Sequence, residues 1–209
     1  MENTESKPTL GRKIYIAAIL SVILVGLPAI SWMYLNGGLK WRKEAVAELG
    51  DYGKIRSAPI IWADGTREDQ LKSKVVVLYV FGENPDLTET NRKVLDTAEK
   101  LYDQFGKNEH FRLAMVASGG TAEFRSHFQK MPSADFATWV WTGGVDSWRA
   151  ITMNGYEYFV KAEKTSPVPQ YYALADTSGT IRRFYDATSD KQVDRMVQHI
   201  ALLLPPAGQ

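Results

Sequence analysis

The sequence contains no cysteine, and this absence excludes a whole class of chemistry. The chain can form no disulfide, use no thiol as a catalyst and offer no thiolate to a metal ion. Histidine is scarce, because the three residues His110, His127 and His199 stand far apart along the chain. The sequence also lacks a Ser-His-Asp motif, a nucleophile elbow and a P-loop. An enzymatic site, if one exists, is therefore not visible in the sequence.

An excess of charge of one sign is also missing. The chain has 25 basic and 24 acidic residues, which gives a formal net charge of +1. The two signs are interspersed, and no long basic run occurs. Nucleic-acid-binding proteins usually carry a clustered basic surface. We therefore expect no nucleic-acid partner.

One long apolar run is present near the start of the chain. Residues Ile14 to Leu35 carry no charge, and a helix of about 20 apolar residues is long enough to cross a bilayer core. The run exceeds the apolar region of a signal peptide, which is about 7–15 residues long, and no A-x-A-like cleavage site follows. We expect a polar N-terminus over residues 1–13 and an uncleaved single-span anchor over residues 14–36. Basic residues flank both ends, so the positive-inside rule gives no orientation.

The rest of the chain is expected to form a juxtamembrane linker or helix over residues 37–57 and one domain over residues 58–205. A hairpin turn is predicted at Asp64-Gly65-Thr66. Runs of apolar and β-branched residues predict strands at Lys74–Phe81, Phe111–Ala117, Phe136–Trp141, Gln170–Ala175 and Thr180–Tyr185. Apolar residues at helical spacing predict helices at about Asp86–Phe105, through Phe124 and Phe128, from Asp146 to about Gly155, and after Ser189. This order predicts an α/β fold, with a thioredoxin-like central sheet and flanking helices.

Two segments carry a more specific resemblance. The segment from Phe81 to Glu89 (FGENPDLTE) is similar to a pattern F-T-x-C-P-x-x-C-P, in which Phe81 and Pro85 match. The segment from Tyr172 to Ile181 is similar to the strand-turn-strand that precedes the last helix in the same proteins. Together with the anchor and the hairpin, these segments resemble the Sco/SenC family. That family comprises membrane-anchored, thioredoxin-like copper proteins that assist the assembly of cytochrome c oxidase.

The resemblance also places the ligands that this chain lacks. Asn84 and Thr88 stand at the two cysteine positions, and Val168 lies near the position of the histidine ligand. Copper(I) favours soft thiolate or thioether ligands, so we expect no metal, no cofactor and no dithiol chemistry here. The resemblance further implies a cis-proline at Pro169, although Pro169 also fits a plain extended approach to the next strand. The pattern Asp86-x-x-Glu89 indicates a helix cap, with a remodelled anion site as the alternative.

These observations favour a binding protein over an enzyme. The resemblance implies an accessory or assembly factor, or a subunit, of a respiratory complex of the cytochrome c oxidase type. It also implies a single-pass protein of the bacterial inner (cytoplasmic) membrane with a periplasmic C-terminal domain. We call Asn84, Thr88 and Val168, which stand at or near the positions where the family has its ligands, the degenerate positions, and their surroundings the degenerate site. A loop near this site is expected to contain Tyr156, Tyr158 and Phe159. These aromatic residues form either a protein interface or part of the core. The alternatives are a membrane-tethered enzyme with a cysteine-independent site and a metal carrier with non-thiolate ligands.

Overall fold

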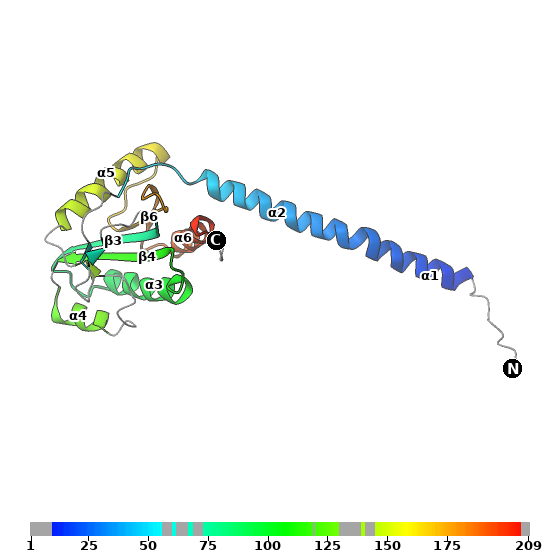
Figure 1. The fold of residues 1–209 in the computed structure, drawn as a ribbon, viewed down its shortest axis with the longest axis horizontal. Helices are drawn as coiled ribbons and strands as arrows, with labels where there is room; N and C mark the ends of the chain where they lie inside the picture. The colour runs from blue at the N-terminus through cyan, green and yellow to red at the C-terminus, as the bar shows by residue number, and fades with distance from the viewer. Residues whose placement is uncertain are drawn as a thin grey trace. The chain divides into compact units, whose positions relative to one another are not determined.

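The computed structural model describes residues 10–55, 60–61, 67–68, 73–118, 120–129, 139–140 and 145–205 (Figure 1). The chain divides into two units, Met1–Glu44 and Ala45–Gln209.

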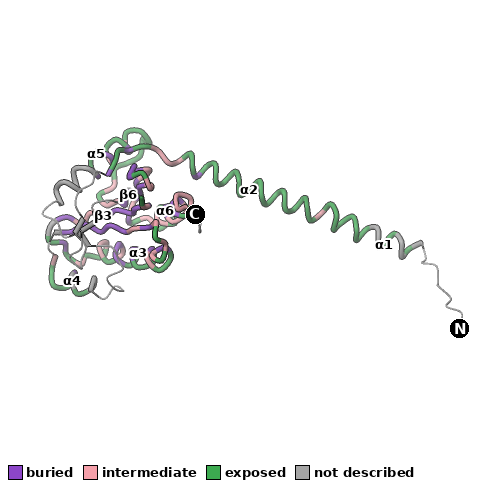
Figure 2. The backbone as a smooth tube through the Cα atoms, viewed as in Figure 1, coloured by how far each residue is buried: buried purple, intermediate pink, exposed green. Residues whose placement is uncertain are grey.

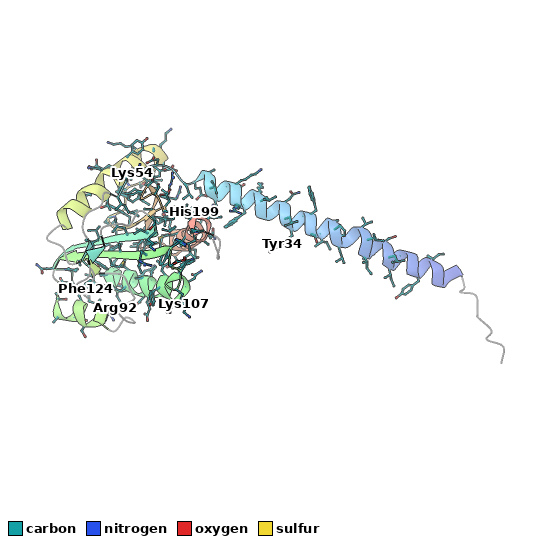
Figure 3. The ribbon with its side chains drawn as sticks, in the orientation of Figure 1. Tyr34, Lys54, Arg92, Lys107, Phe124 and His199 are labelled. Carbon is teal, nitrogen blue, oxygen red and sulfur yellow. The ribbon has the colours of Figure 1, made fainter. Side chains whose placement is uncertain are left out.

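The first unit is helical. Helix α1 (Leu10–Ser21) continues through a π-helical stretch (Val22–Gly26) into α2 (Leu27–Ala47). The π-helical stretch lies just before Pro28, which has no N–H to donate to the carbonyl one turn earlier. The segment Ala18–Ala47 is long and apolar enough to cross a membrane. Apart from Ala45, which is buried, its side chains are largely exposed, as Figure 3 shows for Tyr34.

The helix does not end where the sequence led us to expect. Asn36, Gly37 and Gly38 lie inside α2, so the expected juxtamembrane segment of residues 37–57 begins as a continuation of the same helix. A glycine inside a helix costs only about 1 kcal/mol relative to alanine. Two glycines therefore weaken this helix without ending it.

The second unit is built on a five-stranded mixed sheet in the order β5-β4-β3-β6-β7. Its strands are β3 (Val75–Glu83), β4 (Phe111–Ser118), β5 (Trp139–Val140), β6 (Tyr171–Ala175) and β7 (Ile181–Asp186). Strands β3, β4 and β5 run parallel, whereas β6 is antiparallel to both β3 and β7. The predicted hairpin is confirmed as the antiparallel pair β1 (Ile60–Ile61) and β2 (Arg67–Glu68), but its turn lies outside the described residues.

Helices cover both faces of this sheet (Figure 1). Helix α5 (Val145–Glu163) packs on one face, where Phe159 joins a core cluster with Val76 and Leu78. Helices α3 (Glu89–Phe105) and α6 (Asp190–Leu203) pack on the other face, over Val75 and Val77. Helix α4 (Ala122–Gln129) follows β4. Figure 2 shows buried residues along β3 and on α3, so the apolar run of β3 is covered on both faces, as predicted.

The domain begins earlier than the expected boundary at residue 58. The segment that follows α2 runs beside β7, where the N–H of Tyr52 donates to the carbonyl of Ile181 and the N–H of Ile181 donates to the carbonyl of Gly53. The side chains of Tyr52 and Ile55 are buried in the α5-side core. Residues 45–55 are therefore part of the folded unit and not a linker.

Helix α5 also extends beyond its expected end near Gly155 and continues to Glu163. Gly155 is buried, and a Cβ on it would lie 2.6 Å from the carbonyl oxygen of Tyr52. The glycine thus marks a close approach of two backbones and not the end of a helix. As a result, α5 contains Tyr156, Tyr158 and Phe159. The prediction that these residues lie in a loop is wrong.

Candidate functional site

The candidate site lies at the carboxyl end of β3. The register of β3 with β4 shifts between Val80 and Gly82, which marks a β-bulge, a feature that bends a strand and often lies next to functional sites. Gly82 has a φ of +94° and Asn84 a φ of +42°, so the chain turns sharply here. Asparagine tolerates the left-handed region better than most residues. This turn places Asn84, the first degenerate position, in an exposed loop.

The second degenerate position has a structural role. Thr88 is the N-cap of α3, and its hydroxyl oxygen accepts a hydrogen bond from the N–H of Asn91 at 3.2 Å. The side-chain amide of Asn91 donates to the carbonyl of Asp86 at 2.7 Å. The capping interpretation of this segment is confirmed, but the cap is Thr88 and not Asp86. Helix α3 therefore begins at Glu89, three residues later than predicted.

Tyr156 fixes the third degenerate position, Val168. Its hydroxyl donates to the carbonyl of Val168 at 3.1 Å and accepts a hydrogen bond from the N–H of the same residue. The ring of Tyr156 stacks on that of Tyr171, with centroids 3.9 Å apart. The backbone of Val168 is therefore satisfied by one side chain of α5 and has no free donor for a neighbouring strand.

The peptide bond before Pro169 is not cis. No cis peptide bond occurs in the described residues, which include Val168 and Pro169. The cis-proline prediction is wrong, and the alternative interpretation, an extended approach to β6, describes this segment. The trans isomer is favoured by about 0.5–1 kcal/mol in X–Pro bonds.

A cavity of about 460 Å³ opens beside these residues. The ladder between β3 and β6 stops at the pair Leu78 and Ala173. The residues beyond that pair, Tyr79–Phe81 on β3 and Val168–Tyr171 before and in β6, line the cavity together with residues of α3 and α5. Its volume lies within the range of small-molecule and side-chain pockets, which is about 300–1,000 Å³.

The three aromatic residues that the sequence analysis treated as one possible interface have different surroundings in the structure. Tyr156 lines the cavity, Phe159 is 7% exposed in the core, and Tyr158 is 59% exposed. Tyr158 lies against the ring of Tyr52, with a centroid distance of 6.0 Å, and it is not among the residues that line the cavity. Phe159 is therefore a core residue, and Tyr156 and Tyr158 do not form one surface.

The site does not fit copper. Asn84 offers an amide, the hydroxyl of Thr88 is engaged as a helix cap, and Val168 offers no ligand atom. Within the described residues, no group of three or more histidine, cysteine, aspartate or glutamate side chains is placed to hold a metal ion. Copper(I) needs soft ligands, so this donor set cannot replace the family's ligands.

Introducing two cysteines alone should not create tight copper binding. We expect Asn84→Cys with Thr88→Cys to compete poorly for copper(I) against a chelator, because the third ligand is still absent. Adding Val168→His to that variant should increase the copper retained per chain, whereas adding Val168→Ala should not. Copper retention is measured by metal analysis after dialysis against the chelator. Tight binding by the double-cysteine variant, or no gain from the histidine, would contradict this assignment of positions.

Sequence reasoning missed Tyr79, which lines the cavity. It is 3% exposed, and burial raises the pKa of its hydroxyl to about 12. The signal was available, since Tyr79 brings a hydroxyl into an otherwise apolar strand that is covered on both faces. The cavity itself had no sequence signal, because it depends on where β3 and β6 stop pairing.

Comparisons with known proteins agree on the fold. No protein-family profile matches the sequence, and no curated protein sequence matches it. A candidate protein disulfide isomerase from Bacteroides thetaiotaomicron is 18% identical with a TM-score of 0.55, and the match covers 75% of this chain and 91% of that chain. A candidate thiol:disulfide interchange protein DsbE from Chlorobium tepidum is 12% identical with a TM-score of 0.52, covering 75% and 99%.

The solved structures that match also include a Sco protein. BsSco, a member of the Sco family of cytochrome c oxidase assembly proteins, is 11% identical with a TM-score of 0.50, covering 71% of this chain and 92% of that chain. At such identities these likenesses bear on the fold. They show that the domain is thioredoxin-like, and that the sequence's resemblance to Sco/SenC proteins extends to the fold.

Proposed function

We propose that this chain is a membrane-anchored, thioredoxin-fold protein that acts by binding a membrane-protein partner and not by thiol or copper chemistry. The partner is a respiratory complex of the cytochrome c oxidase type, for which the chain is an accessory or assembly factor or a subunit. By analogy with Sco/SenC proteins, the anchor lies in a bacterial inner membrane and the domain on the periplasmic side.

The state of the degenerate site is the observation that supports this proposal most. Thr88 serves as a cap and Val168 is held by Tyr156, so two of the three former ligand positions now stabilise the fold. A cavity of about 460 Å³ nevertheless remains beside them. A retained cavity without the family's reactive groups is suited to binding, and a tether would raise the domain's effective concentration for partners in the same membrane.

The anchor gives a first test. We expect the full chain to remain in the membrane pellet after carbonate extraction, because Ala18–Ala47 is long and apolar enough to span the bilayer. Mass spectrometry of the mature N-terminus accompanies the extraction. A mature N-terminus beyond residue 36, or a chain found wholly in the soluble fraction, would contradict an uncleaved anchor.

The partner is tested by co-isolation. A tagged full chain is cross-linked in native membranes, purified, and analysed for bound proteins and for copper and zinc. We expect a membrane protein to co-purify and Met153→Ala to reduce its yield about fivefold, because Met153 is 45% exposed and lines the cavity. Tyr158→Ala is the matched control on the same helix and should leave the yield unchanged.

The outcomes separate the proposal from its alternatives. Stoichiometric copper or zinc in the purified chain would favour a metal carrier. Absence of any membrane partner would overturn the docking role and favour a cysteine-independent enzymatic site. Equal loss of partner in the Tyr158→Ala variant would move the interface away from the cavity.

A further inference from the structure

The walls of the cavity combine apolar surface with a single charge. Tyr79, Phe81 and Tyr171 supply aromatic walls, and Met153 adds a flexible apolar side chain. Within the described part of the chain, Glu157 is the only charged residue among those that line the cavity. An anionic ligand would therefore meet a like charge and no basic partner, whereas a cation would meet a carboxylate and electron-rich rings.

Charged residues of both signs lie close to Asn91 in the sequence. Helix α3 supplies Asn91 to the lining, and the segment that leads to it carries the exposed carboxylates Asp86 and Glu89. The two basic residues that follow Asn91 already have acidic partners. Arg92 lies 3.8 Å from Glu123, and Lys93 lies 2.8 Å from Asp190. Among the described lining residues, Glu157 therefore remains the charge that the cavity presents to an occupant.

Tyr79 supplies an independent sign of a ligand. This residue is 3% exposed and lines the cavity. Its hydroxyl has no hydrogen-bond partner in the residues that the structure describes. The hydroxyl is not among the buried polar atoms that lack a partner, so it is accessible and can pair with a group that enters the cavity. An occupant with a hydrogen-bonding group would satisfy it.

We infer that the cavity receives a lysine or arginine side chain of the partner protein, an inference that rests on the proposed function. A basic residue presents three matching features. Its alkyl stem packs on the apolar walls, its cationic end pairs with Glu157, and the carbonyl of its own peptide accepts a hydrogen bond from the hydroxyl of Tyr79.

Binding of short peptides to the full chain in detergent micelles tests this inference. The probes are acetyl-Ala-Ala-Lys-Ala-Ala-amide and the same peptide with norleucine or glutamate in place of lysine, titrated by saturation-transfer NMR. We expect the lysine peptide to bind at least tenfold more tightly than the norleucine peptide, and the glutamate peptide to bind weakest. Equal binding of the lysine and norleucine peptides, or preference for glutamate, would overturn the inference.

Two variants and a control assign the effect to the cavity. Glu157→Gln should reduce the preference for lysine over norleucine to less than threefold. Tyr79→Phe should weaken the lysine and norleucine peptides by a similar factor, about three- to tenfold, because it removes a contact to the backbone. Glu99 is an exposed acid on another helix, α3, and does not line the cavity, so Glu99→Gln should change nothing. An unchanged preference in Glu157→Gln would overturn the assignment of the charge.

The controls also separate this inference from the proposed function. If n-butylammonium binds as tightly as the lysine peptide, the occupant is a free amine and not a partner side chain. If the peptides show no preference but Met153→Ala still loses the membrane partner, only the chemistry of the occupant is wrong. If the peptides bind as expected and no membrane protein co-purifies, the basic side-chain pocket stands and the proposed membrane partner does not.

Discussion

Lowering the pH from 7.5 to 5 should reduce the free energy of unfolding of the domain by about 2 kcal/mol through His199 alone. His199 is fully buried on α6, where Figure 3 labels it. Burial lowers the pKa of His199 to about 4, and the nearby guanidinium of Arg195 adds to the effect. Its Nδ1 pairs with the hydroxyl of Tyr185 at 2.7 Å. Nε2 lies 3.7 Å from the Glu48 carboxylate and has no hydrogen-bond partner among the described residues.

The sign follows from proton binding. An unfolded histidine has a pKa of about 6.5, so between pH 6.5 and 4 the unfolded chain binds a proton that the folded chain does not. Acid therefore favours unfolding in this window. The pKa of Glu48 is also lowered, by its hydrogen bond from Arg195. This second group loses its stabilising contribution only as the pH falls below the ordinary glutamate value.

Urea titrations of the full chain in detergent, followed by near-UV circular dichroism, measure this dependence. His199→Gln should lose most of the change between pH 7.5 and 5, whatever its stability at pH 7.5. Substituting His110, which is partly exposed, by glutamine serves as the control and should keep the change. A parent chain whose stability is flat across this range would show that His199 is not held neutral by burial.

Gly155→Ala should destabilise the domain by about 2 kcal/mol, which reverses the usual effect of this substitution in a helix. The new Cβ would lie 2.6 Å from the carbonyl oxygen of Tyr52 and 3.2 Å from the ring of Phe184. One neighbour is backbone, held by the hydrogen bond from the N–H of Tyr52 to Ile181. The segment of residues 45–55 must therefore move away from α5.

The neighbouring Asn154→Ala tests whether the loss is due to this contact. Asn154 is exposed on the same helix, and alanine there should leave stability unchanged or raise it slightly. The same urea titrations give both values. A Gly155→Ala variant as stable as the parent would mean that the approach of residues 45–55 to α5 is looser than the structure has it.

Long periodic patterns in the sequence predicted the sheet and its helices well. The apolar run of β3 and the helical spacing of α3 leave little choice, because burying them requires those elements. Local signals were less reliable where a distant contact decides the conformation. Gly155 resembles a helix end until the backbone of Tyr52 is placed beside it. Residues 45–55 resemble part of a linker until their hydrogen bonds to β7 are known.

The candidate site was predictable in its position but not in its contacts. The resemblance to Sco/SenC proteins named Asn84, Thr88 and Val168, none of which carries a thiolate or thioether group. It could not show that Tyr156 fixes Val168, because those residues lie 12 positions apart and meet only through the packing of α5 against the sheet. The cavity, with the hydroxyl of Tyr79 in its lining, arises in the same way, because β3 and β6 no longer pair after Leu78 and before Ala173.

Site-specific photo-cross-linking in native membranes tests the central claim most directly. The full chain carries a photoreactive phenylalanine analogue either at Met153, which lines the cavity, or at Tyr158, which lies outside it on the same helix. We expect position 153 to cross-link to one membrane protein and position 158 to give no such product. Cross-links from position 158 alone, or none from position 153, would contradict a docking role for the cavity.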